Sequence, residues 1–440
     1  MINIELEDIK EFSNKYNSNP ENKIIENAIR KNGVQKTCLR QDIVVKNQPV
    51  FNIELPNSKR YDQKESSKCW IYAGFNTIKY NMAENLNIDL MKFELSSNYI
   101  AFFDKLEKSN NDYENIINLP NDVSIDFIKK EKILCYCGNE GGYWQLFTNI
   151  VNKYGLIPEN YMPNPIEGED STEIEKLYGE KIEKDIVYLL EAKNRNESIE
   201  TLRKMKKEFL QENYALLSKI LGEPPTTFTY EYKDKENNYI RKENLTPIKF
   251  KEQFLTLNLN DFVSIGNVPM YNKEYQKIYQ KKYYNNIYKE NNTKFLNLPI
   301  NELKTLVINQ LKSGMPVYML VSIRKYRDKK SGVLDNELYD YENMLGLKRL
   351  SKEEAINFNN ISPHHAMAFV GVNVIDEKPE KWKIEDSYGT KEKVDGYYIM
   401  NDNYFGEFVF NVIIDKKYLT EEQLELLKQT PIEYEIDEPI

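Results

Sequence analysis

The chain has 440 residues, of which 40% are hydrophobic and 29% are charged, and its formal net charge is −9. No uninterrupted apolar run approaches the ~20 residues of a membrane-spanning helix, so we expect a soluble globular protein with no membrane partner. The acidic balance also argues against a general affinity for nucleic acid or for anionic membrane surfaces.

The N-terminus and the cysteine content indicate a reducing compartment. The first eight residues are acidic and lack the basic stretch and apolar core of a secretory signal. A chain of this length would need more than four cysteines for a disulfide framework, and it contains Cys38, Cys69, Cys135 and Cys137. We therefore expect a cytoplasmic protein with reduced thiols.

Helical periodicity dominates the first half of the chain. Apolar residues recur at helical spacing in residues 21–32, up to a glycine. A second apolar helical run begins at Cys69, with Ser66 and Ser67 as candidate N-caps. Residues 182–221 show a third helical pattern, which a Gly-Glu-Pro-Pro sequence ends.

Strand-like runs dominate the second half. Residues 302–313 predict one more helix, and strands are expected at the apolar runs 317–323, 366–374, 396–400 and 408–414. Thr420 and Gln423 form a capping box that starts a last helix. Because helices come first and strands last, the pattern predicts an α+β fold with two lobes.

The scarcity of histidine narrows the search for a catalytic pair. The chain has two histidines, His364 and His365, and they are adjacent. A thiolate is a good nucleophile at a helix N-terminus beside an imidazole, because both lower the pKa of the thiol. If Cys69 is a nucleophile, its base must therefore be one of these two histidines. The alternative is an ordinary buried cysteine on an apolar helix.

Two further polar residues complete a candidate catalytic group. Gln63 lies shortly before Cys69, where its amide can donate to a developing oxyanion together with the backbone N–H of Cys69. Asp386 lies downstream of His365 and can accept a hydrogen bond from its imidazole across a β-hairpin. The alternatives are an ordinary loop residue at position 63 and simple turn chemistry at position 386.

Three segments resemble a known family. Residues 63–76 begin Gln-Lys-Glu-Ser-Ser-Lys-Cys-Trp, residues 363–367 read Pro-His-His-Ala-Met, and residues 382–389 contain Glu-Asp-Ser-Tyr-Gly. They are similar to the Gln-Lys-Ser-Ser-Gly-Arg-Cys-Trp, His-Ala-Met and Glu-Asn-Ser-Trp-Gly segments of the bleomycin hydrolase/aminopeptidase C family of papain-like cysteine peptidases. The resemblance runs over almost the whole chain and includes Gly-Gly-Tyr-Trp at 141–144 and Leu-Thr-Glu-Glu-Gln-Leu at 419–424.

The resemblance implies a thiol protease that releases amino acids from the N-termini of peptides. It implies that Cys69 is the nucleophile, that His365 is the general base and that Gln63 donates to the oxyanion. Asp386 stands where the family has an orienting Asn. No metal or other cofactor is expected, since zinc would need further ligands beside the Cys-x-Cys of residues 135–137.

The glycine pair Gly141 and Gly142 resembles the pair whose exposed backbone aligns the substrate in papain-like clefts. Glycine suits that position because a Cβ would obstruct an approaching peptide. An ordinary turn is the alternative for these two residues.

The resemblance also implies a domain organisation. The histidine follows the cysteine by ~130–150 residues in simple papain-like enzymes, and this chain is roughly 150 residues longer in that interval. We expect residues 1–154 to form the first part of the catalytic domain and residues 155–300 an inserted helical and hook-like oligomerisation region. Residues 301–440 then form the β-rich lobe and tail. Family members use such insertions to build a homohexamer with an internal chamber that admits peptides.

The C-terminal tail departs from the family pattern. In the family, the terminal carboxylate receives the amino group of the substrate, a role that would fall to Ile440. The tail is about four residues shorter when Pro439 is aligned with the family's late proline, which removes ~13 Å of extended chain. Either the acidic tail still holds the amine in another register, or the cleft is more open and cleavage falls further from the N-terminus.

Other departures are smaller. Asp386 replaces an Asn, so we expect a shifted pH profile. Tyr388 replaces a shielding Trp, and Ser67-Lys68 replaces Gly-Arg, which we expect to alter loop flexibility more than chemistry.

Residues 271–294 carry six lysines among six tyrosines and two acidic residues. Such a pattern suits single-stranded nucleic acid, and weak binding is a secondary possibility that the resemblance also implies. A subunit-contact arm is the favoured alternative because the chain is acidic overall. A non-catalytic oligomer that binds peptide or nucleic acid is the third functional hypothesis.

Overall fold

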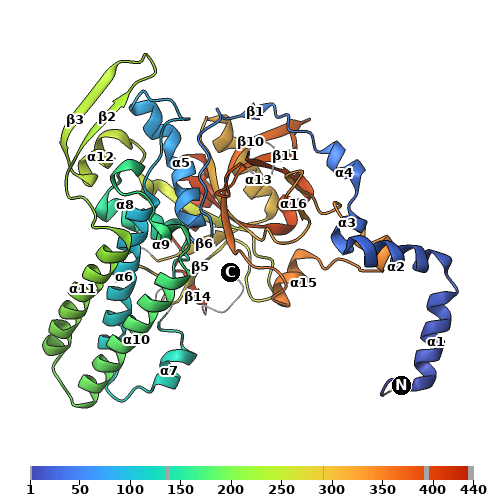
Figure 1. Cartoon of the computed structure of the whole chain (residues 1–440), viewed down its shortest axis with the longest axis horizontal. Helices are drawn as coiled ribbons and strands as arrows, with labels where there is room; N and C mark the ends of the chain where they lie inside the picture. Colours follow the sequence, from blue (N-terminus) through green and yellow to red (C-terminus); the bar gives the residue numbers. More distant parts are fainter. Residues whose placement is uncertain (1, 135–138, 291, 391–395, 435–440) are drawn as a thin grey trace.

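The computed structural model describes residues 2–134, 139–290, 292–390 and 396–434. Long helices gather on one side of the molecule and a sheet on the other, and an N-terminal arm projects beyond the sheet (Figure 1). The two lobes confirm the predicted α+β class.

The helices of the first half are α1 (Leu6–Asn17), α2 (Pro20–Asn32), α3 (Val34–Cys38), α4 (Gln41–Lys46), α5 (Cys69–Asn85), α6 (Ser97–Asn118), α7 (Ile125–Lys130), α8 (Trp144–Tyr154), α9 (Ile166–Glu169), α10 (Thr172–Asn194) and α11 (Ile199–Leu221). Those of the second half are α12 (Pro247–Phe254), α13 (Ile300–Lys312), α14 (Tyr341–Leu345), α15 (Lys352–Asn357), α16 (Asp402–Phe408) and α17 (Glu421–Leu426).

The strands before residue 300 are β1 (Ile53–Glu54), β2 (Phe228–Lys233), β3 (Tyr239–Leu245), β4 (Phe262–Gly266), β5 (Lys277–Lys281) and β6 (Lys294–Asn297). The later strands are β7 (Val317–Val321), β8 (Arg327–Asp328), β9 (Val333–Leu334), β10 (His365–Ile375), β11 (Lys378–Glu385), β12 (Tyr397–Asn401), β13 (Val409–Asp415) and β14 (Ile432–Tyr434).

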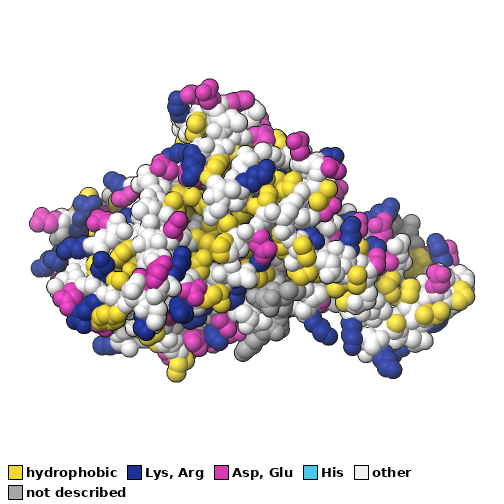
Figure 2. Space-filling model, turned by 90° about the horizontal axis from the view of Figure 1, so that it is seen from above, with side chains coloured by type: hydrophobic (Ala, Val, Ile, Leu, Met, Phe, Trp, Pro, Cys, Tyr) yellow, Lys and Arg dark blue, Asp and Glu magenta, His cyan; other side chains and the backbone are white. Residues whose placement is uncertain are grey.

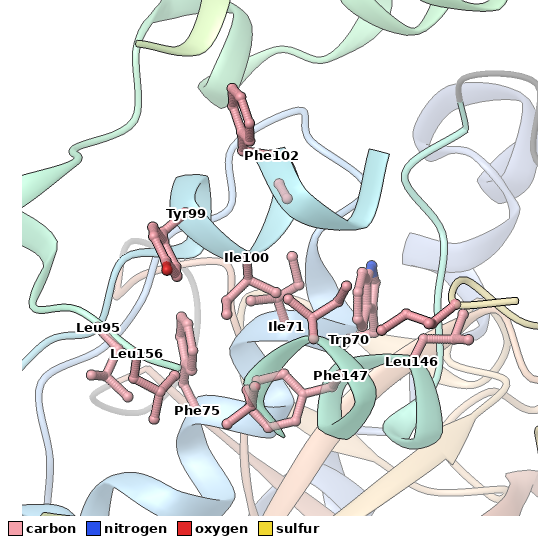
Figure 3. Packing of buried hydrophobic residues seen from close by; sticks show 14 of the residues in the cluster. Trp70, Ile71, Phe75, Leu95, Tyr99, Ile100, Phe102, Leu146, Phe147 and Leu156 are labelled. Carbon is pink, nitrogen blue, oxygen red and sulfur yellow. The ribbon is translucent and has the colours of Figure 1, made fainter. Parts of the chain in front are cut away.

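Helix α5 is the central element of the helical lobe. Its side chains are buried on nearly all sides, so it lies inside the protein rather than on its surface. Figure 3 shows Trp70 and Phe75 of α5 packed with Phe147 of α8. The Phe75 and Phe147 rings meet edge to face at 5.7 Å. Gly74 makes room for this contact, since a Cβ there would come within 2.8 Å of the Phe147 ring.

The main sheet has the strand order β14-β5-β6-β4-β13-β7-β10-β11-β12-β9-β8, and β1 pairs with β10. Strand β10 is antiparallel to β7 on one side and to β11 on the other. Helix α5 packs against β10 and β7. The helical lobe therefore meets the sheet along the helix that begins at Cys69 and the strand that begins at His365.

The second-half predictions agree closely with the structure. The predicted helix is α13, and the four predicted strands are β7, β10, β12 and β13 with small shifts at their ends. The capping box of Thr420 and Gln423 starts α17 as expected. Residues 21–32 form α2, which Gly33 ends with a left-handed backbone.

Two helix predictions need correction. Lys68 is the N-cap residue of α5 and no side chain caps that helix, so Ser66 and Ser67 are not its caps. Residues 182–221 form two helices rather than one, because the chain turns between α10 and α11. Asn196 takes a left-handed backbone there, and Ser198 caps α11.

The region 155–300 contains both helices and sheet strands. Helices α10 and α11 and the separate hairpin β2–β3 extend the helical side. The last strands of this region join the main sheet, where β4 pairs with β13 and β6 pairs with β4 and β5.

The N-terminal arm carries apolar side chains that this chain does not cover. Helices α1 and α2 have no buried residue. Figure 2 shows hydrophobic side chains along this projecting part of the molecule. The exposed apolar side chains of α1, of α2 and of the residues before α1 include Ile4, Leu6, Ile9, Phe12 and Ile24, each at least 47% exposed.

A buried ionic cluster holds the end of β11, next to Asp386. Glu385 is fully buried and pairs with Arg60 and with Lys79, whose Nζ lies 2.6 Å from its Oε1. The Ser58 hydroxyl lies 3.2 Å from both carboxylate oxygens. Such a cluster tolerates the loss of one member poorly, because the remaining charges stay buried without compensation.

We predict that Glu385→Gln lowers the free energy of unfolding by about 3 kcal/mol, since it leaves two cations facing a neutral amide in the core. Urea denaturation followed by circular dichroism measures this change. Glu231→Gln breaks the exposed ion pair with Arg241 and serves as the matched control, with no expected shift of the midpoint. Equal midpoints for the two variants would contradict the prediction.

Candidate active site

Cys69 lies at the edge of a cleft between the helical lobe and the sheet. It is the first residue of α5, is partly exposed and has a free thiol. The cleft has an empty volume of about 1020 Å³ and is lined by residues from both lobes, including Gln63, Gly141, Gly142 and His365. The N-terminal end of a helix favours a negative charge, so the position suits a thiolate.

His365 connects Cys69 to Asp386. Its Nε2 lies 2.9 Å from Oδ1 of Asp386, which is fully buried. Burial by itself lowers the pKa of His365, but the Asp386 charge, the hydrogen bond to it and the Cys69 thiol together raise this pKa to about 10. The imidazole is therefore held as an imidazolium beside the thiol at neutral pH.

The backbone places Asp386 at the end of the strand that runs beside the one carrying His365. Strands β10 and β11 form an antiparallel hairpin in which Ala368 pairs with Glu385, so Asp386 follows directly on the strand beside the histidine. The same Oδ1 also accepts the backbone N–H of Ser387 at 2.7 Å. The predicted contact across a β-hairpin is present in the structure.

Tyr388 covers the imidazole from one side. Its ring stacks on His365 with centroids 5.4 Å apart and an interplanar angle of 16°. Burial raises the pKa of Tyr388 to about 12, so the phenol stays neutral. The tyrosine is 43% exposed and shields the His365–Asp386 bond only in part.

Gln63 is held rigidly in the cleft by the segment that follows Asp386. Its Oε1 accepts the Ser387 hydroxyl at 2.6 Å, and its backbone N–H donates to the Ser387 carbonyl at 2.6 Å. One N–H of its amide donates to the Ser66 carbonyl at 2.6 Å. A primary amide has a second N–H, and no acceptor for it is present among the described residues.

Gly141 and Gly142 line the cleft but differ in what surrounds them. A Cβ on Gly142 would lie 2.6 Å from the Trp70 ring, so this position requires glycine. A Cβ on Gly141 would meet a single atom, Oδ1 of Asn139 at 3.4 Å, and would otherwise point into open space. Gly141 therefore leaves the cleft open on this side, while Gly142 allows the backbone to approach Trp70.

Glu140 links the glycine segment to the cysteine loop, a role that we did not predict from the sequence. Its carbonyl accepts Trp70 Nε1–H at 2.6 Å, and its carboxylate accepts the backbone N–H of Ser67 at 3.3 Å. Burial would raise the pKa of Glu140, but Lys105 and Lys68 outweigh it and lower this pKa. A buried carboxylate beside a Gly-Gly pair has no distinctive sequence signal.

Lys68 is fully buried rather than part of a flexible loop. Its Nζ donates to Oδ1 of Asn164 at 2.9 Å and to the Gly168 carbonyl at 2.8 Å. Burial lowers the pKa of this lysine. The expectation that Ser67-Lys68 mainly alters loop flexibility is therefore replaced by an anchoring contact directly before Cys69.

His364 is bonded to a backbone carbonyl and not to Asp386. Its Nδ1 donates to the Ser362 carbonyl at 2.9 Å, and burial lowers its pKa to about 4. Although it lines the cleft, it stays neutral at neutral pH. The geometry thus distinguishes the two adjacent histidines by their partners and by their charge.

Several predicted features lie outside the described residues, namely Ile440 with most of the acidic tail, and Cys135 and Cys137. Tyr434 in β14 is the last described residue, and β14 runs parallel to β5. Within the described ranges, no group of three or more metal-ligating side chains is present. None of the described helices combines the length and apolar character that a membrane crossing requires.

Comparisons with known proteins match nearly the whole chain, both in sequence and in fold. The model of the Peptidase C1-like family matches residues 3–440. The chain is 32% identical to an aminopeptidase G of Lactobacillus delbrueckii subsp. lactis over 97% of each chain, and 31% identical to an aminopeptidase C of Listeria monocytogenes over 97% and 96%. The crystal structure of PepW from Lactobacillus rhamnosis has a TM-score of 0.94 and 32% identity, covering 100% and 99% of the two chains.

Because the chain has two histidines, their titration can be followed separately by NMR on ¹⁵N-histidine-labelled protein. We predict one imidazole that loses its proton near pH 10 and one near pH 4. Asp386→Asn removes the negative charge that stabilises the imidazolium, so the higher pKa falls. A wild-type imidazole titrating near 6.5, or a higher pKa that Asp386→Asn leaves unchanged, would show that Asp386 does not bind His365.

Proposed function

Since the chain belongs to the Peptidase C1-like family and its fold is papain-like, we propose that it is a cysteine-type aminopeptidase. It releases amino acids from the N-termini of peptides by thiolate attack and acyl-enzyme formation. Relatives named aminopeptidase C, G, E and W support this activity. The family resemblance to aminopeptidase C is thereby confirmed.

The observation that carries the proposal is the position of His365 between Cys69 and Asp386. Asp386 orients the imidazole through Nε2 and keeps it protonated, which leaves the thiol proton on the imidazolium and the sulfur as a thiolate. The thiolate attacks the substrate carbonyl carbon. The imidazolium then gives its proton to the leaving amine, and the acyl group remains on Cys69.

In the second half of the reaction, His365 acts as a general base. It takes a proton from a water molecule, whose oxygen attacks the acyl carbon and displaces the Cys69 thiolate. Asp386 as a carboxylate stabilises the imidazolium more strongly than an Asn would. We therefore propose that activity persists with Asp at this position, and that the alkaline limit of the pH profile lies high.

We further propose that Gln63 and the backbone N–H of Cys69 form the oxyanion hole. As the first residue of α5, Cys69 has an N–H without an intrahelical acceptor. The second amide N–H of Gln63 is held toward the cleft by the Ser387 and Ser66 contacts. Gly141 and Gly142 align the substrate main chain along the opposite edge of the cleft.

The position of the substrate amine decides between an aminopeptidase and the alternative of altered, endopeptidase-like cleavage. In our proposal, the tail after β14 holds the amine, with Ile440 or a neighbouring acidic residue as the acceptor. Two observations support a tail that starts near the cleft. Strand β14 lies beside β5, and Tyr434 of β14 lines the same pocket as Tyr143, which also lines the cleft. The non-catalytic hypothesis is disfavoured, since the thiol, imidazole and carboxylate are arranged for catalysis.

We propose self-association into a homohexamer and a cytoplasmic location. The uncovered apolar side chains of α1 and α2 support a second copy as the partner of the arm. The low number of cysteines supports the reducing compartment.

Nucleic-acid binding by residues 271–294 is a weaker, secondary proposal. Lys273 and Lys281 are buried, and each lies over tyrosine rings of this chain. These two lysines are therefore not available to bind the phosphates of a nucleic acid. This favours the interpretation of the segment as a subunit contact. An affinity for single-stranded DNA that falls steeply with salt would support binding.

We predict hydrolysis of fluorogenic aminoacyl amides with a free amine, at least about 100-fold faster than that of the same substrates blocked at the amine. Cys69→Ala is expected to abolish the activity, while Cys38→Ala, which removes a buried thiol that does not line the cleft, retains it. Rapid cleavage of blocked peptides would establish the endopeptidase-like alternative. Absence of Cys69-dependent cleavage of either class would support the binding-scaffold hypothesis.

We predict that the double variant Ile9→Glu with Phe12→Glu lowers the oligomeric state, because it places charges on the uncovered apolar face of α1. Lys10→Glu with Asn14→Glu alters the opposite face of the same helix and is the matched control. Sedimentation velocity measures both. An unchanged assembly in the first variant would exclude the arm as a subunit contact.

A further inference from the structure

A narrow pocket lies beside the cleft and shares three residues with it. Tyr143, Leu320 and Pro363 line both spaces. The pocket has an empty volume of about 390 Å³, compared with about 1020 Å³ for the cleft. We call it the side pocket, and its remaining lining residues include Trp144, Tyr318, Thr293 and Asn411. The 390 Å³ includes space open to solvent, and the enclosed part of the side pocket has room for a small polar group only.

Four residues that line the side pocket each carry a buried polar atom without a partner among the described residues. These atoms are Nε1 of Trp144, the hydroxyl oxygens of Tyr318 and Thr293, and Oδ1 of Asn411. Trp144, Tyr318 and Asn411 are at most 3% exposed. Buried polar groups are normally paired, so four unpaired atoms on residues that line one small space indicate a missing hydrogen-bonding group.

The donor and acceptor character of these four atoms limits which chemical group can pair with them. The indole N–H of Trp144 can only donate, and the amide oxygen of Asn411 can only accept. The hydroxyls of Tyr318 and Thr293 can do either. A primary carboxamide offers a carbonyl oxygen for the donor and an NH₂ for the acceptor. A carboxylate leaves Asn411 without a donor, an ammonium leaves Trp144 without an acceptor, and an alkyl group pairs with none of them.

The side pocket is close to the reacting sulfur. Burial raises the pKa of Tyr318 well above its usual value, and the charge of Cys69 raises it further, so the phenol keeps its proton and lies within electrostatic range of the thiolate. Tyr143 follows directly on Gly141 and Gly142. A peptide lying along the glycine pair would therefore pass the mouth of the pocket.

We propose that the side pocket binds the primary carboxamide of a glutamine or asparagine side chain on the acyl side of the scissile bond. Tyr318, Trp144, Thr293 and Asn411 are then specificity-determining residues. The proposal rests on the cysteine peptidase activity described above and adds a substrate class to it. Methionine, which is close to glutamine in length but lacks the amide, is the natural comparison.

Two variants remove one hydroxyl each with little change of shape, Tyr318→Phe and Thr293→Val. Neither hydroxyl has a hydrogen-bond partner among the described residues, so neither variant removes a bond between them, and thermal unfolding should show no destabilisation. Tyr178→Phe is the matched control, because the Tyr178 hydroxyl is buried and bonded to the Ser109 hydroxyl at 3.2 Å, away from the cleft.

The measurement is kcat/KM for free-amine fluorogenic substrates with glutamine, glutamate or methionine at the first or the second position of the acyl part. We expect the glutamine substrate to exceed both others by about tenfold or more at one of the positions. Tyr318→Phe and Thr293→Val each reduce the ratio of glutamine to methionine turnover several-fold, whereas Tyr178→Phe preserves this ratio.

Two results would overturn the proposal while leaving the peptidase function intact. One is Cys69-dependent turnover of methionine substrates with no preference for glutamine at either position. The other is a glutamine preference that Tyr318→Phe and Thr293→Val do not alter.

Calorimetry with the Cys69→Ala variant tests the side pocket without turnover. Tighter binding of glutamine amide than of methionine amide, reduced by Tyr318→Phe, supports the proposal even if no hydrolysis is found. Equal affinities overturn it and indicate that ordered water alone fills the space.

Discussion

The buried hydrogen bond between His365 and Asp386 is the interaction on which the site depends. It aligns the imidazole, keeps it protonated beside Cys69 and ties the end of β11 to the start of β10. A buried carboxylate is costly unless it is paired, so the surrounding fold must supply its partners. The residue after Asp386 is Ser387, whose hydroxyl donates to Gln63, so the candidate site residues are joined by one short segment.

The cleft is built from two lobes whose rigidity has different origins. On the helical side, aromatic packing around α5 and the anchoring contacts of Lys68 and Glu140 fix the loop before Cys69. On the sheet side, antiparallel pairing and the Glu385 cluster fix the hairpin that presents His365 and Asp386. Because each half of the candidate site is held independently, its geometry depends on how α5 packs against β10 and β7.

Prediction from the sequence worked best where local chemistry and periodicity agree. The apolar strands after residue 316, the capping box at Thr420 and the helix starting at Cys69 are all present because short-range patterns specify them. It was wrong for the caps of α5 and for the single helix at 182–221. Caps depend on the path of the preceding loop, and Lys68 is drawn inward by Asn164 and Gly168, which lie far along the chain.

The sequence by itself determined the class of chemistry, since one cysteine at a helix start, two histidines and an aspartate leave few possible nucleophile and base pairs. Its family segments also assigned His365 rather than His364. Only the tertiary structure showed the physical reason, which is that burial keeps His364 neutral while Asp386 keeps His365 charged. The unpaired polar atoms of the side pocket likewise became visible only after folding, because burial and hydrogen-bond pairing are properties of residues brought together from α8, β7, β13 and the loop before β6.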